Sequence, residues 1–409
     1  MCMPTSRLTA WVMWIVASIF YAYQYLLRVM PNIVIDDIMQ QFQIGAAAIG
    51  QFSSIYYIGY SLMHLPIGIL LDRYGPKKIM SICILLTVIG LLPLIFATHW
   101  IYPIAGRALI GMGSSAAILG LFKIIRLSFS EEKFPRMLSI SVMIGLLGAI
   151  YGGGPVGYLR EIYGYHAVVQ LFTLIGIVLM GITYWMIPNV KSSRPTSMMS
   201  EIKVVIFNKR VIWCCLFAGL MVGPLEGFAD VWGRSFLKEV YQFDGTLAAS
   251  LPSMIFIGMC FGAPILSLIA EKTGNHLTTI IGAGIIMTIS FSSLLIWHLN
   301  TNWMGFNFII VGICCAYQIL AIYKASTYVS EQAAGLTTAV ASMIIMIFGY
   351  TFHAIIGSII NVFGGPNNEQ ALICGIAVIP IGLTIGILGF VILFMSEQIK
   401  TEKELLPSS

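Results

Sequence analysis

Charged residues are scarce in this sequence: Asp, Glu, Lys and Arg together make up 10% of its 409 residues, whereas 58% are hydrophobic. Soluble globular proteins contain about 25% charged and about 45–50% apolar residues, so the composition excludes an ordinary soluble domain. The alternation of apolar and polar residues that marks half-buried strands is also missing. Instead, apolar stretches near the ~20 residues that a helix needs to cross a bilayer recur along the whole chain. The sequence therefore predicts an integral membrane protein whose spans are helices.

Features of several other protein classes are also missing. The apolar run at residues 11–30 contains no small-residue cleavage site, so it is interpreted as a first span and not as a signal peptide. The cysteines have no metal-ligand spacing, and neither a nucleotide-binding loop nor a pair of suitably spaced catalytic acids occurs. We therefore expect no metal, no cofactor and no enzymatic activity, and an energy source other than ATP.

Polar breaks between the apolar runs predict twelve helices. The first six are expected at residues 9–32, 46–71, 78–97, 101–126, 135–158 and 166–187. The second six are expected at residues 210–236, 246–270, 277–298, 303–327, 335–361 and 371–395. A polar stretch at residues 189–209 is interpreted as a cytoplasmic linker between two bundles, residues 1–188 and 210–395, with a cytoplasmic tail at residues 396–409.

The 22 Lys and Arg residues predict the orientation of the spans. If both termini are cytoplasmic, all but seven of them lie in inside loops and tails. Those seven are three outside (Arg160, Arg234 and Lys238) and four within spans (Arg28, Arg107, Lys123 and Lys324). The positive-inside rule therefore places both termini in the cytoplasm, and we expect a multi-pass protein of a bacterial inner membrane. Membrane orientation also explains the net charge of +5, so no nucleic-acid partner is expected.

The two halves of the chain carry matching residues. The stretch GILLDRYGPKK, Gly68 to Lys78, follows the second predicted helix, and its acid-base-x-Gly core returns after the eighth helix as EKTG, close to half the chain length later. Two further matches at nearly the same offset pair Gly111 with Gly312 and Lys123 with Lys324. An internal duplication explains these matches.

These stretches resemble signatures of the major facilitator superfamily. GILLDRYGPKK is similar to that family's loop between helices 2 and 3, although Pro76 stands where a basic residue is commoner. RALIGMGSSA, Arg107 to Ala116, is similar to the helix-4 signature, and GLLGAIYGGGPVG resembles the Gly-Pro-rich helix-5 signature with a rearranged order. The resemblance implies an all-α membrane fold of two pseudo-symmetric six-helix bundles, a central site with alternating access, and a functional monomer.

The repeated loop is also a candidate conformational latch. The carboxylate of Asp72 would pair with a neighbouring cation or a helix N-terminus in one conformation and lose that partner in another. We therefore predict a cytoplasmic gate made of Asp72, Arg73, Gly75, Glu271 and Lys272. An ordinary inside turn with basic residues is the alternative.

Polar groups within the spans are the candidate site, because they are unfavourable in a membrane unless they face a cavity or a partner. In the first span Tyr21, Tyr25 and Arg28 share one helix face, and Gln24 lies beside it. A stripe of polar and aromatic groups of this kind is typical of the lining of an aqueous path.

In the seventh span Glu226 and Asp230 share a face at i and i+4. The repeat offset carries Arg28 to Ala229, between these two acids, so we predict that Arg28 faces Glu226 or Asp230 across the central cavity. Such a site suits a zwitterion: Arg28 would bind a carboxylate, and an acid would meet an ammonium group or carry the coupling proton. A salt bridge that only closes an outer gate is the alternative.

These expectations define three groups of residues. The predicted substrate-binding residues are Tyr21, Gln24, Tyr25, Arg28, Arg107, Glu226 and Tyr317. The predicted proton-coupling residues are Glu226, Asp230 and His64. Lys123 and Lys324, near the inside ends of the fourth and tenth spans, are expected to line the cavity as a pair of cations or to snorkel to water.

Two segments narrow the substrate class. LLRVMPNIVIDDIMQQFQI, Leu26 to Ile44, and EGFADVWGRSFL resemble helices 1 and 7 of phagosomal amino-acid and nucleoside importers of intracellular bacteria. Together with the zwitterion-compatible charges, this resemblance points to uptake of an amino acid or similar small polar metabolite. The titratable groups within the spans favour protons as the coupling ion. Because the cations within the spans outnumber the acids, an antiporter for organic phosphates or carboxylates stays open. A membrane sensor that binds a ligand without moving it is a third reading.

Overall fold

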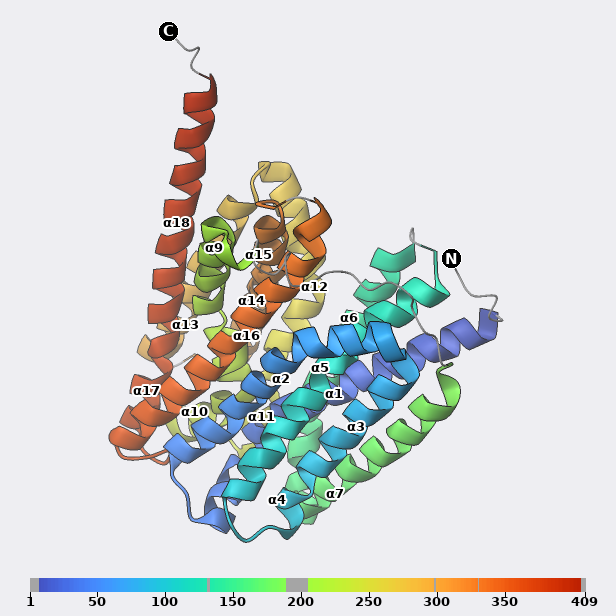
Figure 1. Ribbon diagram of the computed structural model, residues 1–409. Coiled ribbons are helices and arrows are strands. Elements are labelled where there is room, and N and C mark those ends of the chain that lie inside the picture. Colours follow the sequence, from blue (N-terminus) through green and yellow to red (C-terminus); the bar gives the residue numbers. More distant parts are fainter. Residues whose placement is uncertain (1–6, 131–132, 189–204, 298, 330, 406–409) are drawn as a thin grey trace.

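The computed structural model describes residues 7–130, 133–188, 205–297, 299–329 and 331–405; of Asp72, as of a few other residues, it describes only the backbone. The regular elements of this part of the chain are all helices (Figure 1). The N-terminal half contains α1 (Arg7–Phe42), α2 (Ala46–Tyr74), α3 (Pro76–Leu91), α4 (Pro93–Phe96), α5 (Ile101–Ser128), α6 (Phe134–Gly152) and α7 (Gly154–Met186). The C-terminal half contains α9 (Lys209–Leu220), the π-helix η2 (Gly223–Trp232), α10 (Gly233–Val240), α11 (Gly245–Ser250), α12 (Ser253–Thr273), α13 (His276–Ile296), α14 (Thr301–Cys315), α15 (Tyr317–Ser326), α16 (Glu331–Val362), α17 (Glu369–Ile376) and α18 (Val378–Leu405).

These helices form twelve membrane spans. Within the described ranges, eleven helical stretches are long and apolar enough to cross a membrane, and one of them, Arg136–Met186, has 51 residues. At ~1.5 Å per residue this stretch is more than twice as long as a hydrocarbon core of ~30 Å is thick. It breaks at Gly153 and bends again at Gly164, whose φ is 78°, so it supplies two spans. The predicted number of spans is confirmed.

Several predicted boundaries need correction. The first span was expected to end at residue 32, but α1 continues through Pro31 to Phe42. Ile33, Ile35 and Ile38 beyond the proline are fully buried, so packing keeps this part helical. The spans expected at 210–236, 303–327 and 371–395 are each divided into shorter helices. The fifth span was expected to end at residue 158, but the helical chain continues to the bend at Gly164.

The two halves repeat one packing contact. Gly111 of α5 lies against the backbone of Tyr56 in α2, and Gly312 of α14 lies against the backbone of Ile255 in α12. A Cβ at either glycine would collide with a carbonyl group, so only glycine permits helices this close. The pairs occupy corresponding positions of the repeat, which means that the duplication seen in the sequence also describes the packing within each bundle.

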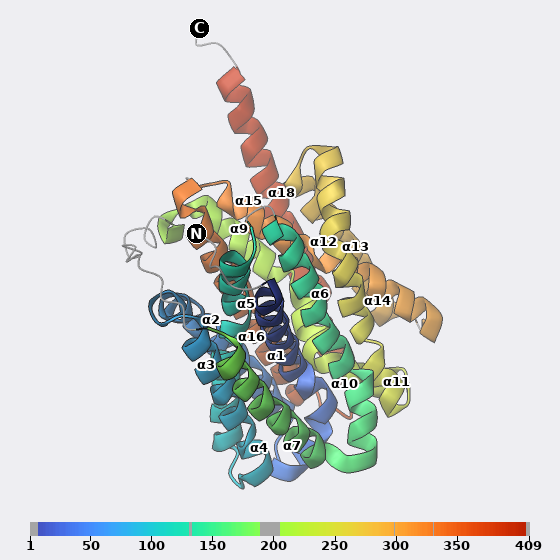
Figure 2. The ribbon, with the colours of Figure 1, turned by 90° about the vertical axis from the view of Figure 1, so that its right-hand side faces the viewer.

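The bundles meet mainly through α2 with α16, and also through α6 with α12 and α1 with η2. Gly50 and Gly357 allow the first pair to approach closely, and Gly153 lies against Ser253 in the second. We call the end of the molecule that carries the ion pair between Asp36 and Arg234 the closed end. The opposite end, toward which the C-terminal part of α18 projects, is the open end, since the bundles diverge there (Figures 1 and 2).

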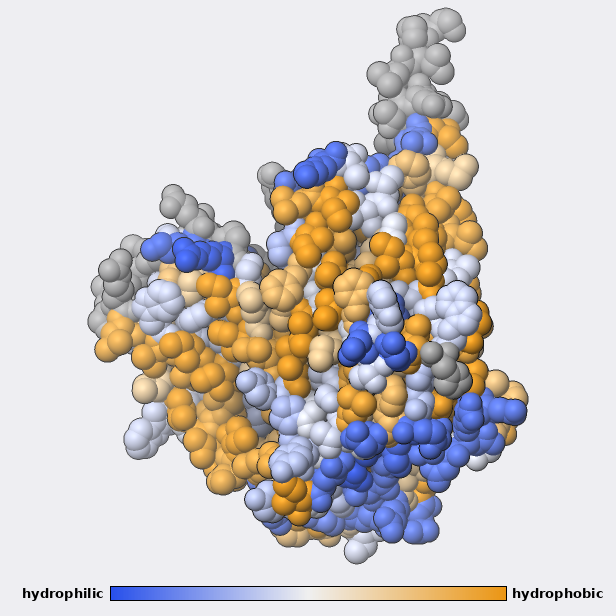
Figure 3. Space-filling view, turned by 180° about the vertical axis from the view of Figure 1, so that it is seen from behind, coloured by the Kyte–Doolittle hydropathy of each residue, from blue (hydrophilic) through white to orange (hydrophobic). Residues whose placement is uncertain are grey.

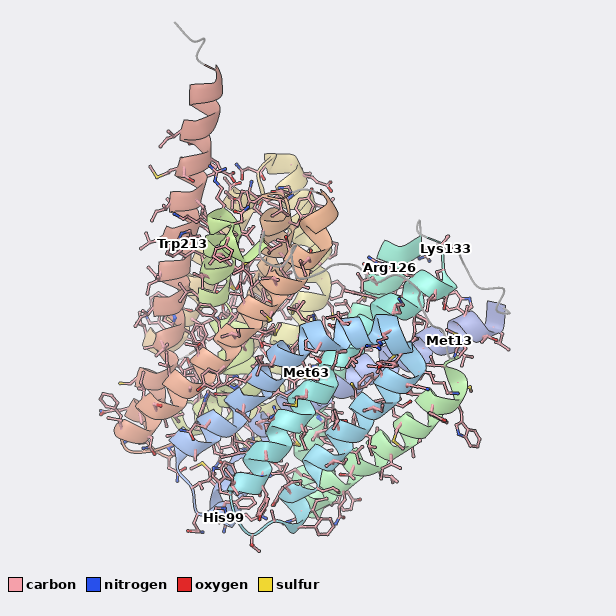
Figure 4. All side chains as sticks on the ribbon, in the orientation of Figure 1. Met13, Met63, His99, Arg126, Lys133 and Trp213 are labelled. Atoms are coloured by element: carbon pink, nitrogen blue, oxygen red, sulfur yellow. The ribbon has the colours of Figure 1, made fainter. Side chains whose placement is uncertain are left out.

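The surface has the distribution expected of a membrane protein. Figure 3 shows hydrophobic side chains over the flanks, hydrophilic side chains gathered at the closed end, and a notch between the bundles at the open end. Figure 4 shows Arg126 and Lys133 at the open end and His99 at the closed end. Two basic residues expected in inside loops therefore lie on the same side as the C-terminal part of α18.

Candidate functional site

A buried charged cluster joins the two bundles. The Arg28 side chain extends from α1 and donates to both acids of η2: its Nε lies 2.6 Å from Asp230 Oδ2, and its Nη2 contacts Glu226 Oε2. Glu226 and Asp230 are fully buried, and Arg28 is 4% exposed. The structure thus brings together the three residues that the repeat offset associates.

The backbone of η2 aims both acids at Arg28. The sequence predicted an ordinary helix here, but Gly223–Trp232 forms a π-helix with its wider i→i+5 turn. Gly223 and Pro224 at its start are the two residue types least favourable in an α-helix, which is a local reason for the change of helix type after α9. Positions i and i+4 lie on nearly the same face of a helix, and both carboxylates reach the same guanidinium.

Tyr57 and His353 complete the cluster. The Tyr57 hydroxyl contacts Glu226 Oε2 and Asp230 Oδ2, yet it has one proton and can donate to only one of them at a time. His353 Nε2 contacts the backbone carbonyl of Glu226, and its ring packs edge-on against Tyr57 with centroids 5.2 Å apart. Neither residue was among the predicted site residues, although His353 is a polar residue within a predicted span, and Tyr57 shares one face of α2 with His64 at i and i+7.

Three buried polar atoms of the cluster have no hydrogen-bond partner among the described residues: Glu226 Oε1, Asp230 Oδ1 and His353 Nδ1. Burying a charge without a partner is strongly unfavourable. One guanidinium here faces two carboxylates, so these three side chains hold one more acidic group than they hold cations.

An aromatic surface adjoins the cluster. Arg28 Cζ lies 5.3 Å from the ring centroid of Tyr25 and 5.3 Å from that of Tyr57, within cation–π range. Tyr21 packs edge-on against Tyr25 with centroids 5.2 Å apart, and Gln24 donates to the Tyr56 hydroxyl at 2.7 Å. The predicted stripe of α1 is therefore continuous with the ion-pair cluster.

His64 lies on α2, seven residues after Tyr57 of the cluster. Its ring stacks on Tyr60 with centroids 5.3 Å apart, and Tyr60 stacks in turn on Tyr56 at 6.1 Å. The buried Nδ1 atom of His64 has no hydrogen-bond partner among the described residues. The structure places His64 at the end of a row of rings and not in contact with Glu226 or Asp230.

Arg107 is buried beside α1 but does not donate to the acids. Its Nη1 donates to the backbone carbonyl of Leu27 at 2.7 Å and its Nη2 to that of Arg28 at 2.9 Å. Its Cζ also lies 4.7 Å from the ring centroid of Tyr56. Both terminal nitrogens of this predicted substrate-binding residue are therefore engaged by the backbone.

Tyr317 and Lys324 contact residues of their own bundle. The Tyr317 hydroxyl donates to the backbone carbonyl of Ala218 at 2.6 Å. Lys324 Nζ lies 2.9 Å from Glu397 Oε2 of α18, whose other oxygen accepts a hydrogen bond of 2.6 Å from Tyr328. Burial and this hydrogen bond raise the pKa of Tyr328, so its hydroxyl stays a donor. Lys123 on α5 is half-buried.

The predicted gate residues lie at the ends of matching helices. Gly75 after α2 has a φ of 83°, and Gly274 after α12 has a φ of 65°; glycine adopts such values without strain. Arg73, Glu271 and Lys272 are exposed. The Asp72 side chain lies outside the described residues. Across the described part of the chain, no three His, Cys, Asp or Glu side chains are arranged to hold a metal ion.

Twelve spans in two bundles, with a buried charged cluster between them, define a multi-pass membrane transporter. The family model described as "Major Facilitator Superfamily" matches residues 13–352, more than half of the chain. The chain therefore belongs to the Major Facilitator Superfamily, as the resemblance implied.

Related sequences are also described as transporters. An uncharacterized transporter of Rickettsia felis is 24% identical over 58% of this chain and 59% of its own length. The putative metabolite transport protein NicT of Pseudomonas putida is 27% identical over 41% of this chain and 40% of its own length. The uncharacterized transporter YybO of Bacillus subtilis is 23% identical over 77% of both chains. The match thus spans less than two thirds of the first two relatives.

Solved structures of low sequence identity share the fold. A bacterial homologue of the human lysosomal transporter Spinster, in an inward-facing and unoccupied conformation, has a TM-score of 0.70 and 18% identity, with 95% of this chain and 96% of that chain covered. The nucleoside transporter NupG has a TM-score of 0.75 and 13% identity, with 93% and 99% covered. These likenesses establish the architecture and leave the substrate to be argued from the site.

Proposed function

We propose that this transporter moves a small zwitterionic metabolite, an amino acid, across a bacterial inner membrane by proton-coupled alternating access. The observation that carries the proposal is the Arg28–Glu226–Asp230 cluster, which is buried at the junction of the two bundles. Membrane transporters of this kind hold substrate and coupling ion near the midplane, between halves that rock against each other.

The composition of the cluster matches both ends of a zwitterion. The Arg28 guanidinium is a two-pronged donor suited to a carboxylate. Glu226 and Asp230 each have one oxygen with no hydrogen-bond partner in the described part of the chain, and this oxygen would accept an ammonium group. A bound substrate carboxylate would compete with the acids for Arg28, so one acid would then need another cation or a proton.

Tyr57 supports the proton-coupling part of the proposal. Its hydroxyl contacts both carboxylates but can donate to only one. Two carboxylates share one guanidinium and one hydroxyl proton, so the cluster is one positive charge short, and an added proton would supply that charge. His64, at the end of the ring row on α2, is the proposed proton carrier toward the open end.

The contacts at the two ends suit alternating access. Arg234 and Asp36 join the bundles at the closed end, with Nη1 and Oδ2 2.8 Å apart, and must separate when that end opens. Arg73, Glu271 and Lys272 would form new contacts when the open end closes, which is the gate proposed for the repeated loops. With both termini in the cytoplasm, the open end faces inward.

The organic-anion antiporter depends on the four cations within the spans. Three of these cations have partners. Arg28 pairs with the two acids, Arg107 donates to backbone carbonyls, and Lys324 pairs with Glu397. An anionic substrate would have to displace these partners, whereas a zwitterion replaces one carboxylate at Arg28 with its own. The zwitterion is therefore the better match to the site.

Uptake of a labelled amino-acid mixture into proteoliposomes tests the proposal. We expect accumulation that requires an inward proton gradient and is abolished by Arg28→Ala and by Glu226→Gln. The matched controls are Arg136→Ala and Glu369→Gln, which replace exposed residues of the same types and should retain uptake. No uptake by the wild type, combined with exchange in vesicles preloaded with phosphorylated or carboxylate metabolites, would favour the antiporter. A bound ligand with no flux would favour the sensor.

A further inference from the structure

Pro31 creates a defect in the backbone hydrogen bonding of α1. In an α-helix the amide of residue 31 would donate to the carbonyl of Leu27, but proline has no N–H. Leu27 and Pro31 are both buried, so bulk water does not reach the carbonyl that is left over. Buried backbone carbonyls nearly always have a partner, and this one needs a donor from elsewhere.

Arg107 supplies that donor. Its Nη1 lies 2.7 Å from the Leu27 carbonyl oxygen, and its Nη2 lies 2.9 Å from the next carbonyl oxygen along the chain, that of Arg28. The planar guanidinium fork is suited to bridging two neighbouring acceptors. Arg107 is 1% exposed and lies over the Tyr56 ring, so neighbouring side chains hold it in this position.

We propose that Arg107 is a positioning residue that replaces the hydrogen bond missing at Pro31 and so fixes the segment of α1 that presents Arg28 to Glu226 and Asp230. This role replaces the substrate-binding role expected for Arg107 from the sequence. Both terminal nitrogens point to the backbone, and the Arg28 backbone that one of them holds carries the side chain of the ion-pair cluster. The inference does not depend on which substrate is transported.

A proline substitution provides a direct test. Pro31→Ala restores an amide that can donate to the Leu27 carbonyl, so it should make Arg107 less necessary. We expect Arg107→Ala to lower the thermal unfolding temperature of the purified protein by several degrees. In the P31A background, Arg107→Ala should lower the unfolding temperature by less than half of that amount. A lysine at position 107 reaches one carbonyl at most. Arg107→Lys should therefore lower the unfolding temperature by less than Arg107→Ala does, and Pro31→Ala should again reduce the loss.

Pro66 is the matched control. It lies inside α2 of the same bundle, so Pro66→Ala also returns an amide to a helix but not to Leu27. If R107A fails to fold, recovery of folded protein in R107A/P31A and not in R107A/P66A gives the same answer. The proposal is overturned if P31A does not rescue R107A, or if P66A rescues it equally well.

Arg107 could hold the contacts of Arg28 in place, or it could only stabilise the fold in general. Combining Arg107→Lys with Arg28→Lys distinguishes these two roles. If Arg107 holds the Arg28 contact, the double variant should lose less stability than the sum of the two single losses, because residues that act through one contact are not additive. Additive losses would contradict a positioning role. Proton-driven uptake, where the wild type shows it, should likewise return in R107A/P31A; the unfolding measurements stand even if the proposed transport activity fails.

Discussion

Arg28 on α1 and Asp230 on η2 form an ion pair between the two bundles, with 2.6 Å between Nε and Oδ2. Both side chains are buried, and they come from elements that must move relative to each other if access to the site alternates. A charge pair in such a place is costly to break unless another partner replaces it. Substrate and proton are the replacements in the proposed mechanism.

Tyr57→Phe removes the hydroxyl that contacts both carboxylates while keeping the ring. Hydrogen bonds to charged groups contribute about 1.5–3 kcal/mol, so we expect proton-driven uptake to fall by at least about tenfold. Uptake rates in proteoliposomes measure the effect. Tyr102→Phe is the control, since Tyr102 is exposed. Unchanged uptake in Y57F would remove Tyr57 from the mechanism.

Arg234→Gln should shift the molecule toward opening of the closed end. The ion pair with Asp36 joins the two bundles, and Asp36 is partly exposed, with 38% of its side chain accessible. The Arg234 side chain is only 4% accessible, so the pair should contribute more than the roughly 1 kcal/mol of a fully exposed ion pair. Labelling of a cysteine introduced at Ser253 should therefore accelerate by about fivefold or more. An impermeant maleimide added on the closed-end side, in a cysteine-free background, reports the rate.

Arg160→Gln is the control for that experiment. Arg160 pairs with Asp37 at 2.7 Å, but both residues belong to the N-terminal half, so their contact does not hold the bundles together. Labelling at position 253 should stay at the wild-type rate. Equal acceleration in R160Q and R234Q would mean that surface charge, and not the bridge between bundles, sets the rate.

Gly111→Ala and Gly312→Ala should destabilise the protein by similar amounts. Each added methyl group would meet a backbone carbonyl of the neighbouring helix, and overpacking of this kind costs about 1–3 kcal/mol. Thermal unfolding of the purified variants measures the loss. Gly282→Ala is the control, because a Cβ there meets nothing within 4 Å; it should be neutral or stabilising. A large difference between G111A and G312A would contradict equivalent packing in the two bundles.

Lys324→Met and Glu397→Gln should each destabilise the protein, because each removes one charge of a partly buried ion pair. The double variant should recover stability and retain proton-driven uptake, as expected of a structural pair. Loss of uptake in the stable double variant would instead indicate that Lys324 acts as a cation of the cavity.

Much of the architecture could be predicted from the sequence, because hydropathy alone locates the spans. The repeat offset also associates Arg28 with Glu226 and Asp230, since a duplicated fold places equivalent helices opposite each other. The break at Gly153 falls in the run Gly152-Gly153-Gly154-Pro155, which is a local signal for bending. The break at Ala316, where α14 ends, has no glycine or proline beside it and could not be predicted. The π-helix η2 was missed as well: Gly223 and Pro224 signal a weak helix but not the type of turn that replaces it.

Contacts to the backbone were the hardest part to predict. Arg107 was predicted to bind substrate because it stands at the position of the family's helix-4 signature. Its contacts with the carbonyl groups of Leu27 and Arg28 leave no mark in the residue types. Pro31 was the available signal, since it reveals which carbonyl lacks a donor. It does not reveal which residue, far along the chain, supplies one.

The most direct test of the central claim is the internal pH of proteoliposomes when an amino-acid mixture is added outside, recorded for the wild type and for Glu226→Gln. The account predicts that the wild type acidifies the interior as labelled amino acids enter, and that E226Q does neither. Entry of the amino acids without acidification, or acidification that persists in E226Q, would contradict the claim that substrate and proton meet at the Arg28–Glu226–Asp230 cluster.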